Sequence, residues 1–244
     1  MKKNNIKILS TKRLSLSIIE QAKEQGVDII EQEFISVKPI VTKEKHEEIM
    51  AAVLAHENSD VAFTSANAVD AITNYLRPDE TNHFPNWDIF CLSGKTKDAL
   101  IPYVYPNRII ATAESASALA KKIIGENKKE IIFFCGNNRR DELPVALKNA
   151  GINVREIVVY ETTPTPHSAK KDVDGILFFS TSAVKSFFSA NQLDKNTVCF
   201  AIGKTTASSI NGFSKNKIIT SEGPTQEMML AAINLYFKNI NVYE

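Results

Sequence analysis

The stretch that decides the fold is Phe63-Thr64-Ser65-Ala66-Asn67-Ala68-Val69, because the chain repeats it as Phe178-Phe179-Ser180-Thr181-Ser182-Ala183-Val184. A second block, Cys91-Leu92-Ser93-Gly94-Lys95-Thr96, returns as Phe200-Ala201-Ile202-Gly203-Lys204-Thr205. Ser65 and Ser180 lie 115 positions apart, and Gly94 and Gly203 lie 109 apart. A looser third block around Glu114 returns 108 positions later around Glu222. The nearly constant offset predicts two domains of one architecture, and ligands favour the cleft between such domains.

The composition limits the class of protein. A chain of 244 residues is long enough for two domains of roughly 100–120 residues each. Its formal net charge of +1 gives no attraction to nucleic acid or to an anionic membrane. The apolar runs are far shorter than the ~20 residues of a membrane span, and the short run after the basic N-terminus does not suit a signal peptide. We therefore expect a cytoplasmic protein that binds neither nucleic acid nor membrane.

The three cysteines, Cys91, Cys135 and Cys199, each sit inside an apolar run. Their number is odd and no two of them form a Cys-x-x-Cys pair. This pattern predicts buried free thiols, without a disulfide or a metal site.

Short apolar runs alternate with amphipathic segments of helical length. Runs that are apolar throughout are typical of strands buried on both faces, so the pattern predicts an α/β fold with parallel sheets covered by helices. The runs lie at residues 6–9, 27–35, 61–64, 89–92, 108–111, 131–135, 154–160, 176–179, 198–202 and 218–220.

The repeat also predicts how the domains are connected. After the third block, the first copy continues through a helix and Gly151, which suits a left-handed helix end, into a further strand. The second copy runs out of chain there, but a helix, Gly26 and a strand with the same layout stand near the N-terminus. One domain is therefore built from both chain ends. We assign residues 1–36 and 166–244 to this discontinuous domain, 41–160 to the inserted domain, and 37–40 and 161–165 to linker strands that contain Pro39 and Pro164.

Hydroxyl groups and glycines gather where predicted strands turn into helices. Ligands bind beyond the carboxyl ends of strands in open α/β sheets, and free N–H groups at helix starts favour anions such as carboxylates. Each serine or threonine there can also be a plain helix cap. These turns contain Ser65 and Asn67, Gly94 and Thr96, Ser180 and Ser182, and Gly203, Thr205 and Thr206.

Two further candidates lie in the inserted domain. Arg139 and Arg140 precede a predicted helix and either bind a ligand or form a solvated pair balanced by Asp141 and Glu142. Tyr160 ends a predicted strand at the domain crossing, where the simplest interpretation is an aromatic side chain packed at the hinge.

Taken together, these blocks resemble the uroporphyrinogen-III synthase family. The matching pieces, in order, are residues 63–69, 140–144 with Leu147 and Gly151, 158–162, 178–184 and 201–207. The resemblance implies two flavodoxin-like parallel-sheet domains joined by a two-stranded extended linker, one of them discontinuous. It also implies a hydro-lyase that needs no metal or organic cofactor. The reaction converts hydroxymethylbilane to uroporphyrinogen III by loss of water, inversion of the terminal pyrrole ring and macrocycle closure in the interdomain cleft.

The resemblance also assigns roles to residues. Tyr160 matches a tyrosine of the interdomain region that assists departure of the substrate hydroxyl as a general acid, or positions it. The family often has Thr-Arg-Pro after its first strand, whereas this chain reads Thr11-Lys12-Arg13-Leu14, which leaves the role of Arg13 open. The residues assigned to substrate binding are Thr205, Thr206, Ser65, Ser180, Ser182, Gly203, Arg140 and Arg13.

The resemblance implies one small-molecule partner, hydroxymethylbilane, together with a monomer, a place in heme biosynthesis, and transient contact with neighbouring enzymes of the tetrapyrrole pathway. An alternative stays open, because no catalytic cluster stands out from the residues alone. A two-lobed small-molecule binding or sensor protein without catalysis would use the same cleft. A paralogue with a purely structural role is a third hypothesis.

Overall fold

The computed structural model describes residues 5–40, 42–54, 59–76, 84–170 and 172–240. Parts of both predicted domains, at 1–4, 41, 55–58, 77–83, 171 and 241–244, lie outside these ranges. The chain divides into two units, Met1–Ser36 with Thr163–Glu244, and Val37–Thr162. Because the first unit contains both chain ends, the discontinuous domain is confirmed. The bounds that we assigned to the linkers stay a prediction.

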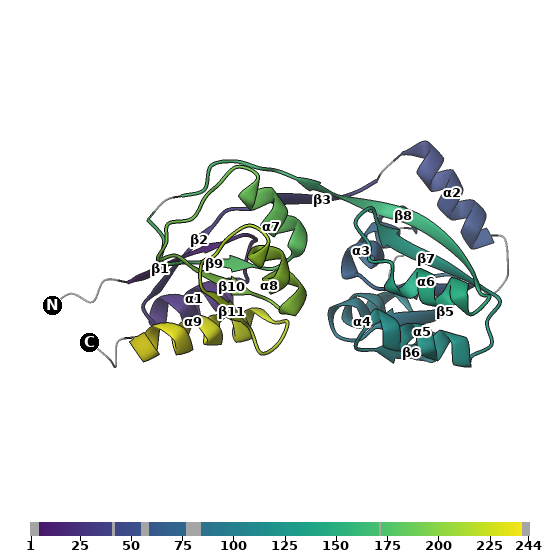
Figure 1. Cartoon of the computed structure of the whole chain (residues 1–244). Helices are drawn as coiled ribbons and strands as arrows, with labels where there is room; N and C mark the ends of the chain where they lie inside the picture. Colours follow the sequence, from purple (N-terminus) through teal and green to yellow (C-terminus); the bar gives the residue numbers. More distant parts are fainter. Residues whose placement is uncertain (1–4, 41, 55–58, 77–83, 171, 241–244) are drawn as a thin grey trace. The chain divides into compact units, whose positions relative to one another are not determined.

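In the described residues, the first unit contains a five-stranded parallel sheet in the order β11-β10-β9-β1-β2 (Figure 1). Neighbouring side chains on β1 point to opposite faces, so that Ile8 and Leu9 enter two separate cores. The strands are β1 (Ile6–Ser10), β2 (Val27–Glu31), β9 (Gly175–Phe178), β10 (Val198–Ala201) and β11 (Ile218–Thr220).

Helices cover both faces of this sheet. On the face of Ile8, α1 (Leu16–Glu24) packs beside α9 (Gln226–Ile240). On the face of Leu9, α7 (Thr181–Phe188) packs beside α8 (Lys204–Asn211). The strands are buried on both sides, which explains why they read as continuous apolar runs.

The second unit has a six-stranded sheet among the described residues, in the order β3-β8-β7-β4-β5-β6. Its strands are β3 (Ile35–Pro39), β4 (Asp60–Phe63), β5 (Asp88–Leu92), β6 (Ile109–Ala113), β7 (Glu130–Gly136) and β8 (Asn153–Pro164). Its helices are α2 (Lys43–Leu54), α3 (Ala66–Leu76), α4 (Lys95–Leu100), α5 (Ala116–Gly125) and α6 (Glu142–Asn149), with short 3-10 turns at Ile101–Tyr103 and Pro106–Arg108.

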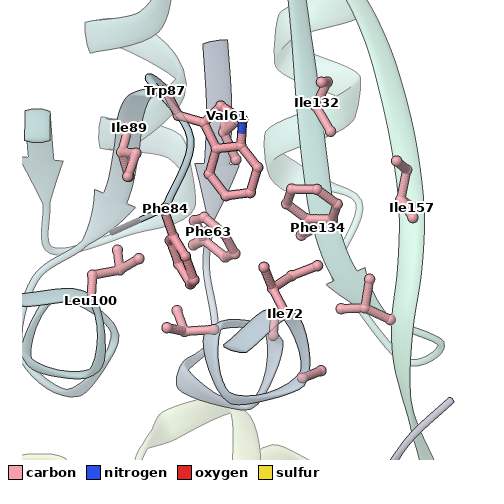
Figure 2. Packing of buried hydrophobic residues seen from close by; sticks show 14 of the residues in the cluster. Val61, Phe63, Ile72, Phe84, Trp87, Ile89, Leu100, Ile132, Phe134 and Ile157 are labelled. Carbon is pink, nitrogen blue, oxygen red and sulfur yellow. The ribbon is translucent and has the colours of Figure 1, made fainter. Parts of the chain in front are cut away.

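The two faces of this sheet have cores of different character. The face covered by α3 and α4 is aromatic, and Figure 2 shows Trp87 lying over the sheet close to Phe63 and Phe134. The ring centroids of Trp87 and Phe134 are 5.7 Å apart, and those of Phe63 and Phe134 are 5.5 Å apart. Burial of one such large apolar side chain contributes about 1.5–3 kcal/mol. The opposite face, under α5 and α6, is mostly aliphatic, with groups such as Leu119 and Leu147 around the two rings of Phe90 and Phe133.

The two sheets have the same strand order when they are read from one edge. The order β11-β10-β9-β1-β2 of the first unit corresponds to β6-β5-β4-β7-β8 of the second, with β1 matching β7 and β2 matching β8. Numbered within the first unit, this is the flavodoxin-like order 2-1-3-4-5. Gly26 and Gly151 occupy the same place, after α1 and α6, with φ of 78° and 80°. The left-handed helix end predicted at Gly151 is confirmed.

Two predicted strand bounds are wrong. The apolar run 27–35 is two strands, because β2 ends at Glu31 and β3 begins at Ile35. Phe34 lies between them, fully buried and packed against Phe187. Tyr160 does not end its strand but lies inside β8, which continues to Pro164.

The predicted two-stranded linker is present as the pair of β3 and β8. Ile40 donates its N–H to the Val159 carbonyl at 3.0 Å, and Thr165 donates to the Phe34 carbonyl at 3.0 Å. Between these two bonds the residue numbers rise from 34 to 40 in one segment and fall from 165 to 159 in the other, so the pairing is antiparallel.

The prediction that the three cysteines are buried free thiols is confirmed. Cys91, Cys135 and Cys199 are free and buried, and burial raises the pKa of these thiols to about 11, 11 and 12. Within the described ranges, no helix is both long and apolar enough to cross a membrane.

Candidate functional site

The central strands β4 and β7 of the second unit end side by side where the strand order changes direction. From β4 the chain proceeds outward to β5 and β6, whereas from β7 it proceeds to β8 on the other side. In doubly wound sheets the crevice at this point, outside the carboxyl ends of the strands, is the favoured ligand site. Thr64 and Ser65 follow β4, and Asn137 and Asn138 follow β7.

A hollow of about 420 Å³ opens at this edge of the sheet. Its polar lining comes from the segments that follow β4, β6 and β7 and from β8 itself. It includes two arginines, Arg139 and Arg140, and two glutamates, Glu114 and Glu142, so that the full charges balance. The neutral donors are the hydroxyl groups of Thr64, Ser65, Ser115 and Tyr160 and the amide of Asn138.

A larger hollow of about 780 Å³ exists in the described part of the first unit, along α9 and the edge strand β11. Apolar side chains such as Met228 and Leu235 form much of its wall. It lies at an edge of its sheet, away from the point where the strand order changes. We therefore place the candidate site at the smaller hollow.

A β-bulge sets the direction of Tyr160. Cys135 pairs with Val158, but the next residue of β7, Gly136, pairs with Tyr160, so that Val159 is one extra residue on β8. Such an extra residue reverses the alternation of faces in the strand beyond it. Tyr160 thus packs on the same face as Val159, the face of α3, instead of on the face of Val158.

The phenol of Tyr160 lies directly over Gly136. A Cβ atom at Gly136 would stand 2.3 Å from Tyr160 Cζ and 2.7 Å from its hydroxyl oxygen. The hydroxyl group donates to Ser65 Oγ at 3.1 Å. Residues from β8, from the end of β7 and from the start of α3 are thereby brought together at the wall of the hollow.

The predicted serines differ in what their hydroxyl groups do. Ser65 uses its backbone carbonyl to accept from the Ala68 N–H, while its hydroxyl pairs with Tyr160. Ser180 caps α7, since its Oγ accepts the Ala183 N–H at 3.1 Å. The two equivalent serines therefore use their hydroxyl groups differently, and a role in ligand binding stays a prediction for both.

The two arginines also differ. Arg139 is ion-paired with both Glu156 and Asp141, and its side chain is 26% exposed. Burial alone would raise the pKa of Glu156, but hydrogen bonds from Lys148 and Arg139 lower it below its ordinary value. Arg140, which the sequence singled out, is 66% exposed and lies 3.9 Å from Glu142 in a weak surface pair.

In the first unit, the remaining predicted residues follow the carboxyl ends of β1, β9 and β10. Arg13 pairs with Glu33 at 3.2 Å and is 82% exposed. Thr205 is exposed, whereas Thr206 is 5% exposed and belongs to the buried polar residues. Ser182 is half-buried in the first turn of α7. Gly203 is the residue just before α8, and apart from its chain neighbours no described atom lies within 4 Å of the place of its missing Cβ. The cleft between the two halves stays a prediction.

Sequence reasoning missed the residues that hold β8 in place. Asn137 and Asn138 both bond to Thr162 of β8, and Gly136 makes room for the phenol. The available signal was the run Gly136-Asn137-Asn138 directly after a buried strand, which is typical of a structured turn at a sheet edge.

Comparisons with known proteins agree with this fold. The chain resembles the crystal structure of a mutant uroporphyrinogen III synthase from the extremely thermophilic bacterium Thermus thermophilus, with 15% identity, a TM-score of 0.66, and coverage of 96% of this chain and 99% of that one. It also resembles uroporphyrinogen-III synthetase from Helicobacter pylori 26695, with 16% identity, a TM-score of 0.65, and coverage of 95% and 99%. At such identities these two likenesses show the fold.

A protein-family comparison shows the family. The model described as uroporphyrinogen-III synthase HemD matches residues 17–231, most of the length of the chain. The chain belongs to the uroporphyrinogen-III synthase family.

Proposed function

We propose that this chain converts hydroxymethylbilane to uroporphyrinogen III, and that the hollow at the carboxyl edge of β4 and β7 holds the reacting end of the substrate. The reaction removes the terminal hydroxyl group as water, inverts the last pyrrole ring and closes the macrocycle. The observation that carries the proposal is the pair of Tyr160 and Ser65, joined at 3.1 Å on the wall of a polar hollow at the point where the strand order changes.

Tyr160 suits the first chemical step. A phenol can donate a proton to the leaving hydroxyl oxygen as the carbon–oxygen bond breaks, which leaves an azafulvene cation on the substrate and water as the product. The tyrosine is then restored by a proton released when the macrocycle regains its aromatic pyrroles. Ser65 holds the phenol oxygen before the substrate arrives, and its own hydroxyl remains a second donor at the site.

The charge balance of the hollow suits a substrate with eight carboxylates. A site with many full positive charges would hold every orientation of such a polyanion, whereas neutral hydroxyl and amide donors discriminate by geometry. Arg140, with its exposed guanidinium, binds a carboxylate at the rim. Ser180, Ser182, Gly203, Thr205, Thr206 and Arg13 of the first unit bind other carboxylates at the equivalent strand ends.

Orientation is the main contribution that we assign to the protein. Hydroxymethylbilane also closes without an enzyme, but then without ring inversion and to the type I isomer. The protein must therefore hold the terminal ring so that attack at its substituted carbon, through a spiro intermediate, is faster than direct closure. Holding reacting groups in place supplies large accelerations without any strong acid or base.

The experiment compares three variants with the wild type in a coupled assay with hydroxymethylbilane, followed by separation of the product isomers. Tyr160→Phe should lower kcat by about 10²-fold, within the range of a lost general acid. Ser65→Ala should lower it less, because the phenol remains. Tyr105→Phe, at a tyrosine that is 56% exposed and does not line the hollow, is the matched control and should behave as the wild type. A wild-type rate in Tyr160→Phe would remove Tyr160 from the acid role.

The finer assignments belong to the same proposal. They are a monomer, the cytoplasm, a place on the route to heme, and transient contact with neighbouring enzymes of the tetrapyrrole pathway. Three buried free thiols support a reducing compartment. The alternative of a binding or sensor protein without catalysis predicts binding of hydroxymethylbilane with no turnover in the same assay.

A further inference from the structure

The turn after β7 extends the sheet beyond the end of the strand. Asn137 donates its backbone N–H to the Tyr160 carbonyl at 3.2 Å. Its side chain then pairs with Thr162 in both directions, because Oδ1 accepts the Thr162 N–H at 2.9 Å and Nδ2 donates to the Thr162 carbonyl at 3.4 Å. The amide side chain of Asn137 thus offers Thr162 both an acceptor and a donor, as the backbone of a longer β7 would do.

The bonds of Asn137 lie where the regular pairing of β7 with β8 ends. The bulge at Val159 interrupts the regular register, and the pairing of Gly136 with Tyr160 is the last one described between β7 and β8. Beyond that point, Asn137 connects the end of β7 to both Tyr160 and Thr162. Asn138 adds a second amide donor to the Thr162 carbonyl, at 3.3 Å.

The phenol of Tyr160 depends on the same segment. It lies over the bare backbone of Gly136 on one side, and its hydroxyl reaches Ser65 at 3.1 Å. A rotation or shift of the backbone at residues 160–162 would lift the ring from Gly136 and lengthen the bond to Ser65. The bonds of Asn137 oppose such a movement directly, since they attach to the residue of the phenol and to the residue two positions further on.

We propose that Asn137 is a positioning residue that acts through Tyr160: by pairing with Thr162 it fixes the bulged segment of β8 and so holds the phenol in its reactive direction. This inference rests on the function proposed above for Tyr160. The described hydrogen bonds of Asn137 go to Tyr160 and Thr162 of β8, and the phenol hydroxyl bonds to Ser65, so the effect of Asn137 on the reaction passes through β8.

The test has one readout that does not depend on activity. Tyrosine rings are labelled with ¹³C, and the signal of Tyr160 is identified by its loss in Tyr160→Phe. Asn137→Ala should shift and broaden this signal. The matched control is Asn153→Ala, since Asn153 lies at the other end of the same strand pair. The described hydrogen bond of its side chain goes to Glu130, away from Tyr160. Asn153→Ala should leave the Tyr160 signal in place.

The second readout is a double-mutant comparison of turnover. Asn137→Ala should lower kcat by about tenfold with KM within about twofold, a smaller loss than the roughly hundredfold effect of a 1 Å misplacement. In the Tyr160→Phe background, Asn137→Ala should lower kcat by less than about twofold. If Asn137 acts only through Tyr160, the two losses of rate do not multiply. Asn153→Ala should keep the wild-type kcat in the wild-type background and leave the rate of Tyr160→Phe unchanged.

The outcomes separate this inference from the function on which it rests. An unchanged Tyr160 ring signal in Asn137→Ala overturns the positioning role, and so do effects of Asn137→Ala and Tyr160→Phe that multiply. A displaced ring signal together with a wild-type rate in Tyr160→Phe supports the placement by Asn137 and overturns the acid role of Tyr160.

Discussion

Gly136→Ala is the change that probes the geometry of the site most sharply. The added Cβ would stand 2.3 Å from Tyr160 Cζ, 2.5 Å from Cε2 and 2.7 Å from the hydroxyl oxygen, whereas ordinary contacts begin at 3.4 Å. The ring must therefore retreat, since the first of these distances must grow from 2.3 Å to at least 3.0 Å, and to 3.4 Å for an ordinary contact. A retreat of this size displaces the hydroxyl group from Ser65.

The cost follows from two contributions. Overpacking a well-packed site costs about 1–3 kcal/mol. Loss of the hydrogen bond between Tyr160 and Ser65 adds about 1 kcal/mol. We therefore expect the second unit to lose about 2–4 kcal/mol of unfolding free energy. The rate should fall by about 10²-fold, as a 1 Å misplacement of a reacting group commonly does.

Urea unfolding and the coupled assay with hydroxymethylbilane measure the two effects. Gly125→Ala is the control, because this helical glycine of α5 has described atoms no closer than 4 Å to its missing Cβ. It should be neutral or slightly stabilising. In a Tyr160→Leu background, which lacks all three clashing atoms, the stability cost of Gly136→Ala should largely vanish. If Gly136→Ala keeps both the wild-type stability and the wild-type rate, the phenol does not lie over Gly136 and the reasoning fails.

Two further predictions concern charges outside the reacting groups. Because the folded-state pKa of Glu156 is lowered, its ion pairs stabilise the protein at a pH above the ordinary pKa of 4.5, and this stabilisation is lost as the pH falls below that value. Urea titrations at several pH values should therefore show a smaller acid-side loss of unfolding free energy in Glu156→Gln than in the wild type. An unchanged dependence of unfolding free energy on pH would contradict this prediction. Lys128 joins β4 and β5 at their amino ends, with Nζ 2.6 Å from Asp60 and 3.2 Å from Asp88. Lys128→Met should cost about 1–3 kcal/mol while kcat stays at the wild-type value, and a fall in kcat would argue against a site at the carboxyl edge alone.

The order and connectivity of the strands were predictable because the sequence patterns that indicate them are local and occur twice. Strands buried on both faces read as continuous apolar runs, and the constant offset between copies shows where each one starts. The error at residues 27–35 has a physical cause. Phe34 is buried in the core of the first unit although it lies between strands, so the apolar pattern does not reveal the break.

The site was predictable only in part. Ser65 was found because a serine after a buried strand is a recognisable local pattern. The bulge at Val159 has no signature in the sequence, and without it Tyr160 would be assigned to the opposite face of the sheet. The run that begins with Gly136 and Asn137 indicates a structured turn, but nothing in the sequence connects that turn with Tyr160. Which of Arg139 and Arg140 is held in ion pairs and which stays exposed depends on Glu156. Glu156 belongs to another strand, so no local sequence pattern can identify it.

The most direct test of the central claim is the isomer composition of the product that the purified chain forms from hydroxymethylbilane. We predict that uroporphyrinogen III dominates for the wild type, and that type I increases in Tyr160→Phe and in Gly136→Ala as spontaneous closure competes with the slowed reaction. Formation of the type I isomer alone by the wild-type chain would contradict the account.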